Sequence, residues 1–234
     1  MKIQKNFSGA FTLIELLAVI AIIGVLAGFI IGGIRSAKQR QAITAATAEL
    51  KLIEDALESY KLKYGAYPPA NQLSSSAAPP PLSMRSPLFY ELSGVTNYSP
   101  TLYLTLDGAF KLSMGPGLGS AYLSNFGLER AVNQFHGNGE DAKAAENFLP
   151  GLKSTMIGTY GNVAGPLASV SNPQLLVTSV RGPDPAWQPL GSLFPDLNPF
   201  QYAYPGTNNP SGYDLWVELH ISGKTNIIGN WTAK

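Results

Sequence analysis

An apolar stretch of 24 residues, from Phe11 to Ile34, places the strongest constraint on what this chain can fold into. Its single ionisable side chain is Glu15. At about 1.5 Å per residue a helix of this length spans about 36 Å, which exceeds the hydrocarbon core of about 30 Å. The stretch therefore has the length of a transmembrane helix. Basic residues flank it on both sides, so the charge distribution does not decide its orientation.

The helical pattern continues beyond the apolar stretch. Residues 35–64 contain neither Gly nor Pro, and Gly65 followed by Pro68 and Pro69 is typical of a helix end. Apolar residues recur there at steps of three and four, which places them on one face of a helix. This predicted stripe consists of Ile43, Ala46, Leu50, Ile53, Leu57, Tyr60 and Tyr64. The sequence thus predicts one helix from Phe11 to Tyr64, about 80 Å long, whose second half is amphipathic.

A cleaved secretory signal peptide is the first alternative for such a basic start and apolar run. Two features argue against it. The run is longer than the usual apolar region of about 7–15 residues, and no small-residue cleavage site with a change of composition follows it.

Glu15 is unusual within this stretch. A carboxylate inside a membrane costs about 2.5–3.5 kcal/mol at the bilayer centre and normally has a partner. No basic residue lies near it within the apolar stretch. Cleavage just before Phe11 would create an α-amino group four residues upstream, which could pair with Glu15 of the same or a neighbouring chain.

The residues around this point, Gly9-Ala10-Phe11-Thr12-Leu13-Ile14-Glu15-Leu16, closely resemble the processing signature of type IV pilins and type II secretion pseudopilins. The resemblance implies cleavage by a prepilin peptidase between Ala10 and Phe11, N-methylation of Phe11, and a role for Glu15 in filament assembly. The family usually has Gly where this chain has Ala10. Cleavage after Gly9 would make Glu15 the sixth residue instead of the fifth, so cleavage after Ala10 is favoured.

The region after the helix, residues 66–193, is expected to be a variable region of loops and short helices. Residues 70–87 are rich in Ser, Ala and Pro and indicate an extended loop. Short helical patterns cover Pro87–Leu92 and Ala121–Asn133. Asp107-Gly108 between two apolar runs, residues 102–106 and 110–112, predicts a hairpin.

The last segment, residues 194–234, has the period of β-strands. Apolar and polar residues alternate over residues 200–204 and 215–220, and Thr225–Ile228 is expected to be a returning strand after a turn at residues 222–224. The segments Asn198–Tyr202 and Tyr213–Trp216 resemble the C-terminal half of the major pseudopilin of type II secretion systems.

The fold class expected from these patterns is α+β. A leader (residues 1–10) precedes a stem helix with a transmembrane part (residues 11–34) and an amphipathic part (residues 35–65). A type IV pilin-like head follows, which consists of the variable region and a small antiparallel sheet over residues 194–234.

Metal and cofactor sites are not expected. Relatives in the resembled family use Asp residues near these strands to bind calcium, whereas residues 220–226 of this chain contain no carboxylate. His136, Glu140 and Asp141 lie close together in the sequence, but beside two Gly residues they are typical of a polar loop. No catalytic residue is assigned, since familiar nucleophile, metal and phosphate motifs do not occur.

The charge and the Cys content argue against further kinds of partner and site. The 16 basic and 15 acidic residues give a net charge of +1, which disfavours nucleic acid as a partner. With no Cys the chain has neither disulfides nor a thiolate nucleophile. Many type IV pilins close a C-terminal loop with a disulfide, so the missing Cys pair favours the secretion type.

The resemblance therefore implies a structural, non-enzymatic subunit of a type II secretion pseudopilus. Its expected partners are prepilin peptidase, other copies of itself, minor pseudopilins, the inner-membrane assembly platform and the membrane. The expected location is the bacterial inner membrane, crossed once, with the head in the periplasm. Two alternatives remain, a type IV pilus subunit and a membrane-anchored head with binding or catalytic activity.

Overall fold

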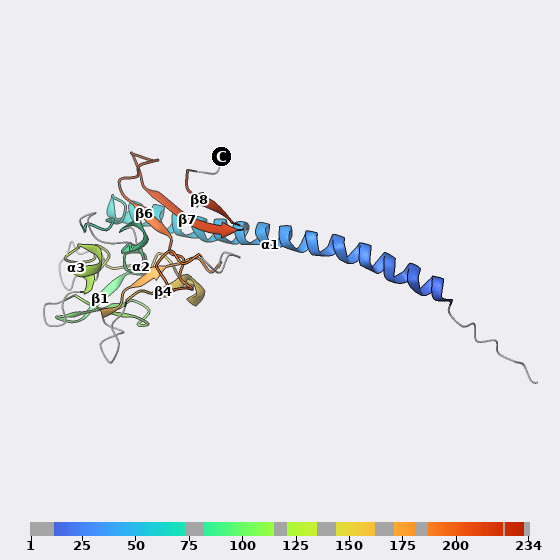
Figure 1. Cartoon of the computed structure of the whole chain (residues 1–234). Coiled ribbons are helices and arrows are strands. Elements are labelled where there is room, and N and C mark those ends of the chain that lie inside the picture. The colour runs from blue at the N-terminus through green and yellow to red at the C-terminus, as the bar shows by residue number, and fades with distance from the viewer. Residues whose placement is uncertain are drawn as a thin grey trace, which may run out of the picture. The chain divides into compact units, whose positions relative to one another are not determined.

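The computed structural model describes residues 12–73, 82–114, 121–134, 144–161, 171–180, 187–221 and 223–231, excluding the side chains of residues 27 and 29–36. The chain divides into two compact units, residues 1–41 and 42–234. Its elements are α1 (Leu13–Tyr64), the 3-10 turn η1 (Leu82–Met84), α2 (Leu88–Ser93), β1 (Val95–Ser99), β2 (Leu102–Thr105), β3 (Lys111–Ser113), α3 (Ala121–Phe126), the 3-10 turn η3 (Ser154–Met156), β4 (Ile157–Thr159), β5 (Gln174–Leu176), β6 (Gln201–Ala203), β7 (Asp214–Ile221) and β8 (Lys224–Gly229) (Figure 1).

The long helix predicted from the sequence is confirmed as α1, which runs without interruption from Leu13 to Tyr64. It ends where Gly65 adopts a left-handed conformation (φ 81°) and donates its N–H to the carbonyl of Lys61 at 2.8 Å. Gly is favoured at this position because it has no Cβ to clash.

The predicted apolar stripe forms part of the core of the second unit. Ala46, Ile53, Leu57 and Tyr60 are each at most 1% exposed. The prediction that Ile43 belongs to the buried stripe was wrong. Ile43 is 36% exposed, and the neighbouring Ala42 packs against the core instead. The second half of α1 is therefore an integral part of the head's hydrophobic core.

Among its described residues, the second unit also contains three small antiparallel sheets, in the orders β1-β2-β3, β4-β5 and β6-β7-β8. This arrangement confirms the α+β class. The hairpin at Asp107-Gly108 joins β2 to β3, and the Asp107 carboxylate accepts hydrogen bonds from the Thr105 hydroxyl at 2.6 Å and the Ala109 N–H at 3.0 Å.

The last sheet follows the predicted alternation. Leu215, Val217 and Leu219 of β7 are fully buried, and β8 pairs with β7 from Lys224 to Gly229. The described residues of the predicted turn at 222–224 join these strands, with Gly223 at φ 73°. In Figure 1 the three strands of this sheet appear together in orange and red.

The region 66–193 differs from the expectation in two respects. Its described part contains three strands that the sequence did not predict, β1, β4 and β5. The helix predicted over Ala121–Asn133 ends at Phe126, because Gly127 adopts a left-handed conformation (φ 68°). Only Gly fits there, since a Cβ would lie 2.7 Å from the backbone of Gln72 and Leu73. The short helix predicted over Pro87–Leu92 is confirmed as α2.

Candidate assembly site

The N-terminus of α1 is closed by Thr12 and Glu15. Oε2 of Glu15 accepts hydrogen bonds from the backbone N–H of Thr12 at 2.8 Å and from its hydroxyl at 2.7 Å. The backbone N–H of Glu15 donates to the Thr12 hydroxyl oxygen at 3.4 Å. This reciprocal pair is a capping box, which satisfies N–H groups left without partners in the first turn. Its Thr-x-x-Glu spacing is visible in the sequence, although Glu15 was expected there only as an assembly residue.

The predicted processing site lies just before this cap. Ala10 and Phe11 are outside the described residues, so cleavage between them and methylation of Phe11 stay predictions. Glu15 lies in the first turn of α1 and is exposed. The capping box fixes the start of the described helix two residues after the predicted new N-terminus.

The surface of α1 that follows Glu15 is apolar and exposed. Between Leu13 and Leu26 the large apolar side chains are 44–76% exposed. They are Leu13, Ile14, Leu16, Leu17, Val19, Ile20, Ile22, Ile23, Val25 and Leu26. Because they occupy nearly every successive position, they cover all sides of the helix. Soluble monomers rarely expose apolar patches above a few hundred Å², so this segment is a strong candidate for burial against other apolar surfaces.

The described residues contain no helix with both the length and the hydropathy that a membrane crossing requires.

The solvent-facing side of the second half of α1 is charged. Lys51 pairs with Asp55 at 3.0 Å, as their spacing of four predicts. Glu58 and Lys61 are connected through the Tyr67 hydroxyl, which receives a hydrogen bond from Lys61 Nζ at 3.2 Å and donates to Glu58 at 2.9 Å.

Glu91 of α2 is a completely buried carboxylate at the centre of the head. Oε1 accepts hydrogen bonds from the Tyr122 hydroxyl at 2.9 Å and the Val132 N–H at 3.0 Å. Oε2 accepts from the Tyr60 hydroxyl and the Asn133 N–H, both at 3.0 Å. Burial raises the pKa of Glu91, and the four hydrogen bonds partly offset that rise.

The same network holds the last turns of α1. The Asn133 side chain donates to the backbone carbonyls of Glu91 and Glu146, both at 2.7 Å, and accepts from the Tyr64 hydroxyl at 2.7 Å. Lys63 also contacts the Glu146 carboxylate at 2.8 Å. Hydrogen bonds thus connect the end of α1 to three separate segments of the head. The sequence predicted Tyr60 and Tyr64 as members of the apolar stripe, but it did not predict their hydrogen bonds to Glu91 and Asn133.

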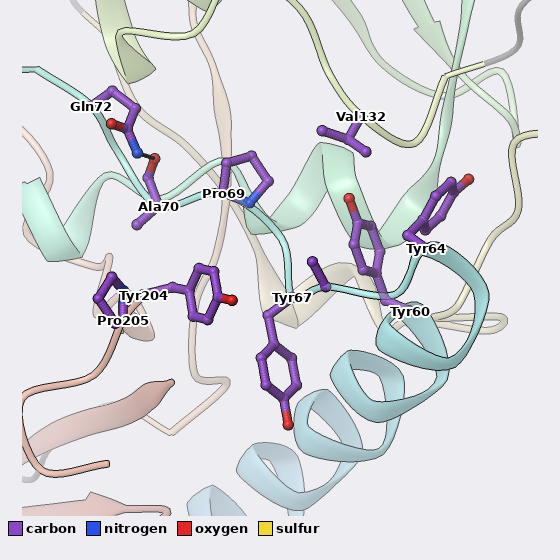
Figure 2. A pocket seen from close by; sticks show the side chains of 10 residues that line it. Tyr60, Tyr64, Tyr67, Pro69, Ala70, Gln72, Val132, Tyr204 and Pro205 are labelled. Carbon is purple, nitrogen blue, oxygen red and sulfur yellow. Dashed lines mark hydrogen bonds between the residues drawn. The ribbon is translucent and has the colours of Figure 1, made fainter. Parts of the chain in front are cut away.

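An apolar pocket of about 380 Å³ lies beside this junction. Figure 2 shows that Tyr60 and Tyr64 reach it from the last turns of α1, whereas Tyr204 and Pro205 come from the segment after β6. Its remaining lining residues are Ala66, Tyr67, Pro69, Ala70, Gln72 and Val132. None of the residues that line the pocket carries a charged side chain.

Of the chain's two His residues, the structure describes only His220. His136, Glu140 and Asp141 lie outside the described residues. His220 stacks on Trp187, with ring centroids 5.4 Å apart, while Glu218 accepts a hydrogen bond from Gln201 at 3.0 Å.

Asp214, the first residue of β7, binds the backbone of the loop that precedes this strand. Its carboxylate accepts the backbone N–H groups of Thr207, Asn208 and Asn209 at 2.7–2.9 Å. Within the described part of the chain, no group of three or more His, Asp or Glu side chains is placed to hold a metal ion. The expectation that the family's calcium site is missing stays a prediction.

Comparison with known proteins confirms the resemblance at the N-terminus. Residues 5–31 match the family described as Prokaryotic N-terminal methylation motif. The chain is also similar to proteins named Type II secretion system core protein G. It is 36% identical to that of Pseudomonas aeruginosa over 69 residues, which are 30% of this chain and 49% of that protein. For Aeromonas hydrophila the identity is 33% over 88 residues, 35% of this chain and 62% of that protein.

The similarity covers only part of each protein. With the protein of Escherichia coli K12 the identity is 39% over 62 residues, 26% of this chain and 43% of that protein. The chain spans about half the length of the curated relatives it matches. No solved structure matches the chain.

Proposed function

We propose that this chain is a structural subunit of a type II secretion pseudopilus and assembles through α1. The observation that carries the proposal is the exposed apolar surface of Leu13–Leu26, which lies within the methylation motif matched over residues 5–31. The names of the similar proteins support the same class. A filament buries such a surface between neighbouring helices, and no chemistry by the subunit is needed.

Processing precedes assembly in this proposal. A prepilin peptidase cleaves between Ala10 and Phe11, and the new amino group of Phe11 is methylated. The subunit starts in the inner membrane with its head in the periplasm, and then joins other copies, minor pseudopilins and the inner-membrane assembly platform. The head needs neither a metal nor a cofactor for this role.

Mass spectrometry of the chain purified from cells with a prepilin peptidase tests the processing step. We expect an N-terminal peptide that begins with methylated Phe11. Cells without the peptidase provide the control and should yield the uncleaved N-terminus. A chain that keeps Met1 in both strains would refute processing.

Variants of Glu15 distinguish two roles of its side chain, the hydrogen bonds that cap the helix and the negative charge. Glu15→Leu removes both, whereas Glu15→Gln keeps a side chain that can complete a capping box. If the negative charge drives assembly, we expect both variants to insert into the membrane but to form few filaments by electron microscopy. Filaments at the normal number in both variants would exclude an assembly role for Glu15. A normal number of filaments in Glu15→Gln but not in Glu15→Leu would assign the assembly role to the capping hydrogen bonds.

A further inference from the structure

The outer face of the sheet β6-β7-β8 carries a row of aromatic and polar side chains. The odd-numbered residues 215–221 of β7 are buried in the core, so the alternate residues Trp216, Glu218 and His220 lie on the opposite face. All three side chains of this β7 row are partly exposed. At about 3.4 Å per residue, the row extends for about 14 Å along the strand.

An aromatic pair stands at each end of the β7 row. The ring of Trp231 lies 5.5 Å from that of Trp216, and it covers Gly229, the β8 partner of Trp216, where a Cβ would be 3.1 Å from the ring. At the other end Trp187 stacks on His220, with an angle of 16° between the ring planes. Trp187 and Trp231 are also partly exposed. The face therefore presents apolar rings at two separate points.

The carboxylate between the two aromatic pairs is held in place. Oε1 of Glu218 accepts a hydrogen bond from the Gln201 amide at 3.0 Å, and the carbonyl oxygen of that amide accepts from the Ser83 hydroxyl at 2.8 Å. Gln201 is only 4% exposed, so its position is fixed by the core. Oε2 of Glu218 has no hydrogen-bond partner among the described residues. A prepositioned acceptor of this kind loses little entropy when it binds a ligand.

This combination of side chains suits a sugar. The C–H face of a sugar ring can stack on an indole, which offers a large flat apolar surface, and a sugar hydroxyl can donate to a carboxylate. Thr225 and Ile227 of β8 lie on the same face, whereas Lys224 pairs with the buried Ile221 and lies on the other. The outer face of β7 and β8 thus has no Lys or Arg, and Glu218 repels an acidic sugar.

We propose that this face binds an uncharged, extended glycan, with sugar rings stacked on the two aromatic pairs and a hydroxyl donated to Glu218. The length of the β7 row matches a short oligosaccharide better than a single sugar. This binding function goes beyond the proposed role in a filament, and neither depends on the other.

Isothermal titration calorimetry of the full chain in detergent tests the class of ligand. We expect chitohexaose, an uncharged glycan, to bind saturably and to change the tryptophan fluorescence, because all three Trp residues of the chain belong to the aromatic pairs. Hyaluronan hexasaccharide carries carboxylates and should bind at least about tenfold more weakly. Tighter binding of hyaluronan, or no saturable binding of either chitohexaose or cellohexaose, would overturn the proposal.

Matched variants test where the glycan binds. Glu218→Gln removes the charge and Trp187→Ala removes a ring from the proposed site, whereas Glu129→Gln and Tyr98→Ala make comparable changes at exposed positions outside this sheet. We expect the first two variants to raise the Kd for chitohexaose at least about tenfold and the other two to leave it unchanged. If circular dichroism shows a lower thermal midpoint for Trp187→Ala, Glu218→Gln decides, since Gln preserves the size of the side chain. Equal affinities of Glu218→Gln and Glu129→Gln would overturn the proposal.

Discussion

Among single residues, Glu91 is the most demanding to bury. Each carboxylate oxygen accepts one hydrogen bond from a tyrosine hydroxyl and one from a backbone N–H. A hydroxyl can rotate, whereas the direction of a backbone N–H is fixed. In Glu91→Gln an NH₂ group must face one of these N–H donors. We therefore expect the free energy of unfolding to fall by about 1–3 kcal/mol, measured by urea denaturation in detergent. An unchanged value would mean that the hydrogen bonds contribute nothing.

The same residue gives the stability a pH dependence. Because burial raises the pKa of Glu91, the native state binds a proton at a pH where the unfolded chain has released it. The contribution of Glu91 to stability therefore falls as the pH rises through its native pKa. We expect the advantage of the wild type over Glu91→Gln to shrink from pH 5 to pH 8. A growing advantage would show that the pKa is lowered instead.

Among the elements, α1 has one side that faces the core and one that faces solvent in its second half. One leucine on each side allows the two to be compared. Leu57 is fully buried, whereas Leu62 is 88% exposed. We expect Leu57→Ala to lower the free energy of unfolding by about 2–5 kcal/mol through lost burial and a cavity. Leu62→Ala, with the same chemical change, should stay within about 0.5 kcal/mol of the wild type. Equal effects in denaturant titrations would contradict the assignment of this face to the core.

The elements also differ in how well the sequence predicts them. The stripe of α1 and the alternation of β7 are local patterns repeated over several turns or pleats, so they could be recognised. The strands β4 and β5 have three residues each, and β5 (Gln174–Leu176) is buried throughout, so no alternation marks it. The end of α3 depends on the approach of Gln72 and Leu73 to Gly127, which no local pattern reveals.

The candidate site was predictable to a similar degree. Glu15 stands out because it is the single charge in an apolar stretch, and its cap follows from the Thr12 spacing. Ala48 and Met156 line one groove beside α1, although more than one hundred residues separate them in the sequence. The partners of Glu91 likewise come from α1, α3 and the segment after α3. Such long-range contacts are fixed by tertiary packing and leave no periodic trace.

For the molecule as a whole, the decisive property is that the second unit has one continuous core. Buried residues of α1, α2, α3 and all three sheets belong to a single hydrophobic cluster. A continuous core of this kind favours unfolding in one cooperative step. Damage to the second half of α1 should therefore weaken the sheet β6-β7-β8 as much as the helix.

The three Trp residues allow this cooperativity to be measured. Trp216 lies in β7, Trp231 contacts it at a ring distance of 5.5 Å, and Trp187 stacks on His220 of β7. Tryptophan fluorescence thus reports on the last sheet alone. We expect Leu57→Ala to lower the thermal midpoint by the same amount in fluorescence and in near-ultraviolet circular dichroism, which also senses the tyrosines around α1. A fluorescence midpoint that stays at the wild-type value would show that the sheet unfolds independently of α1, and the single core would be refuted.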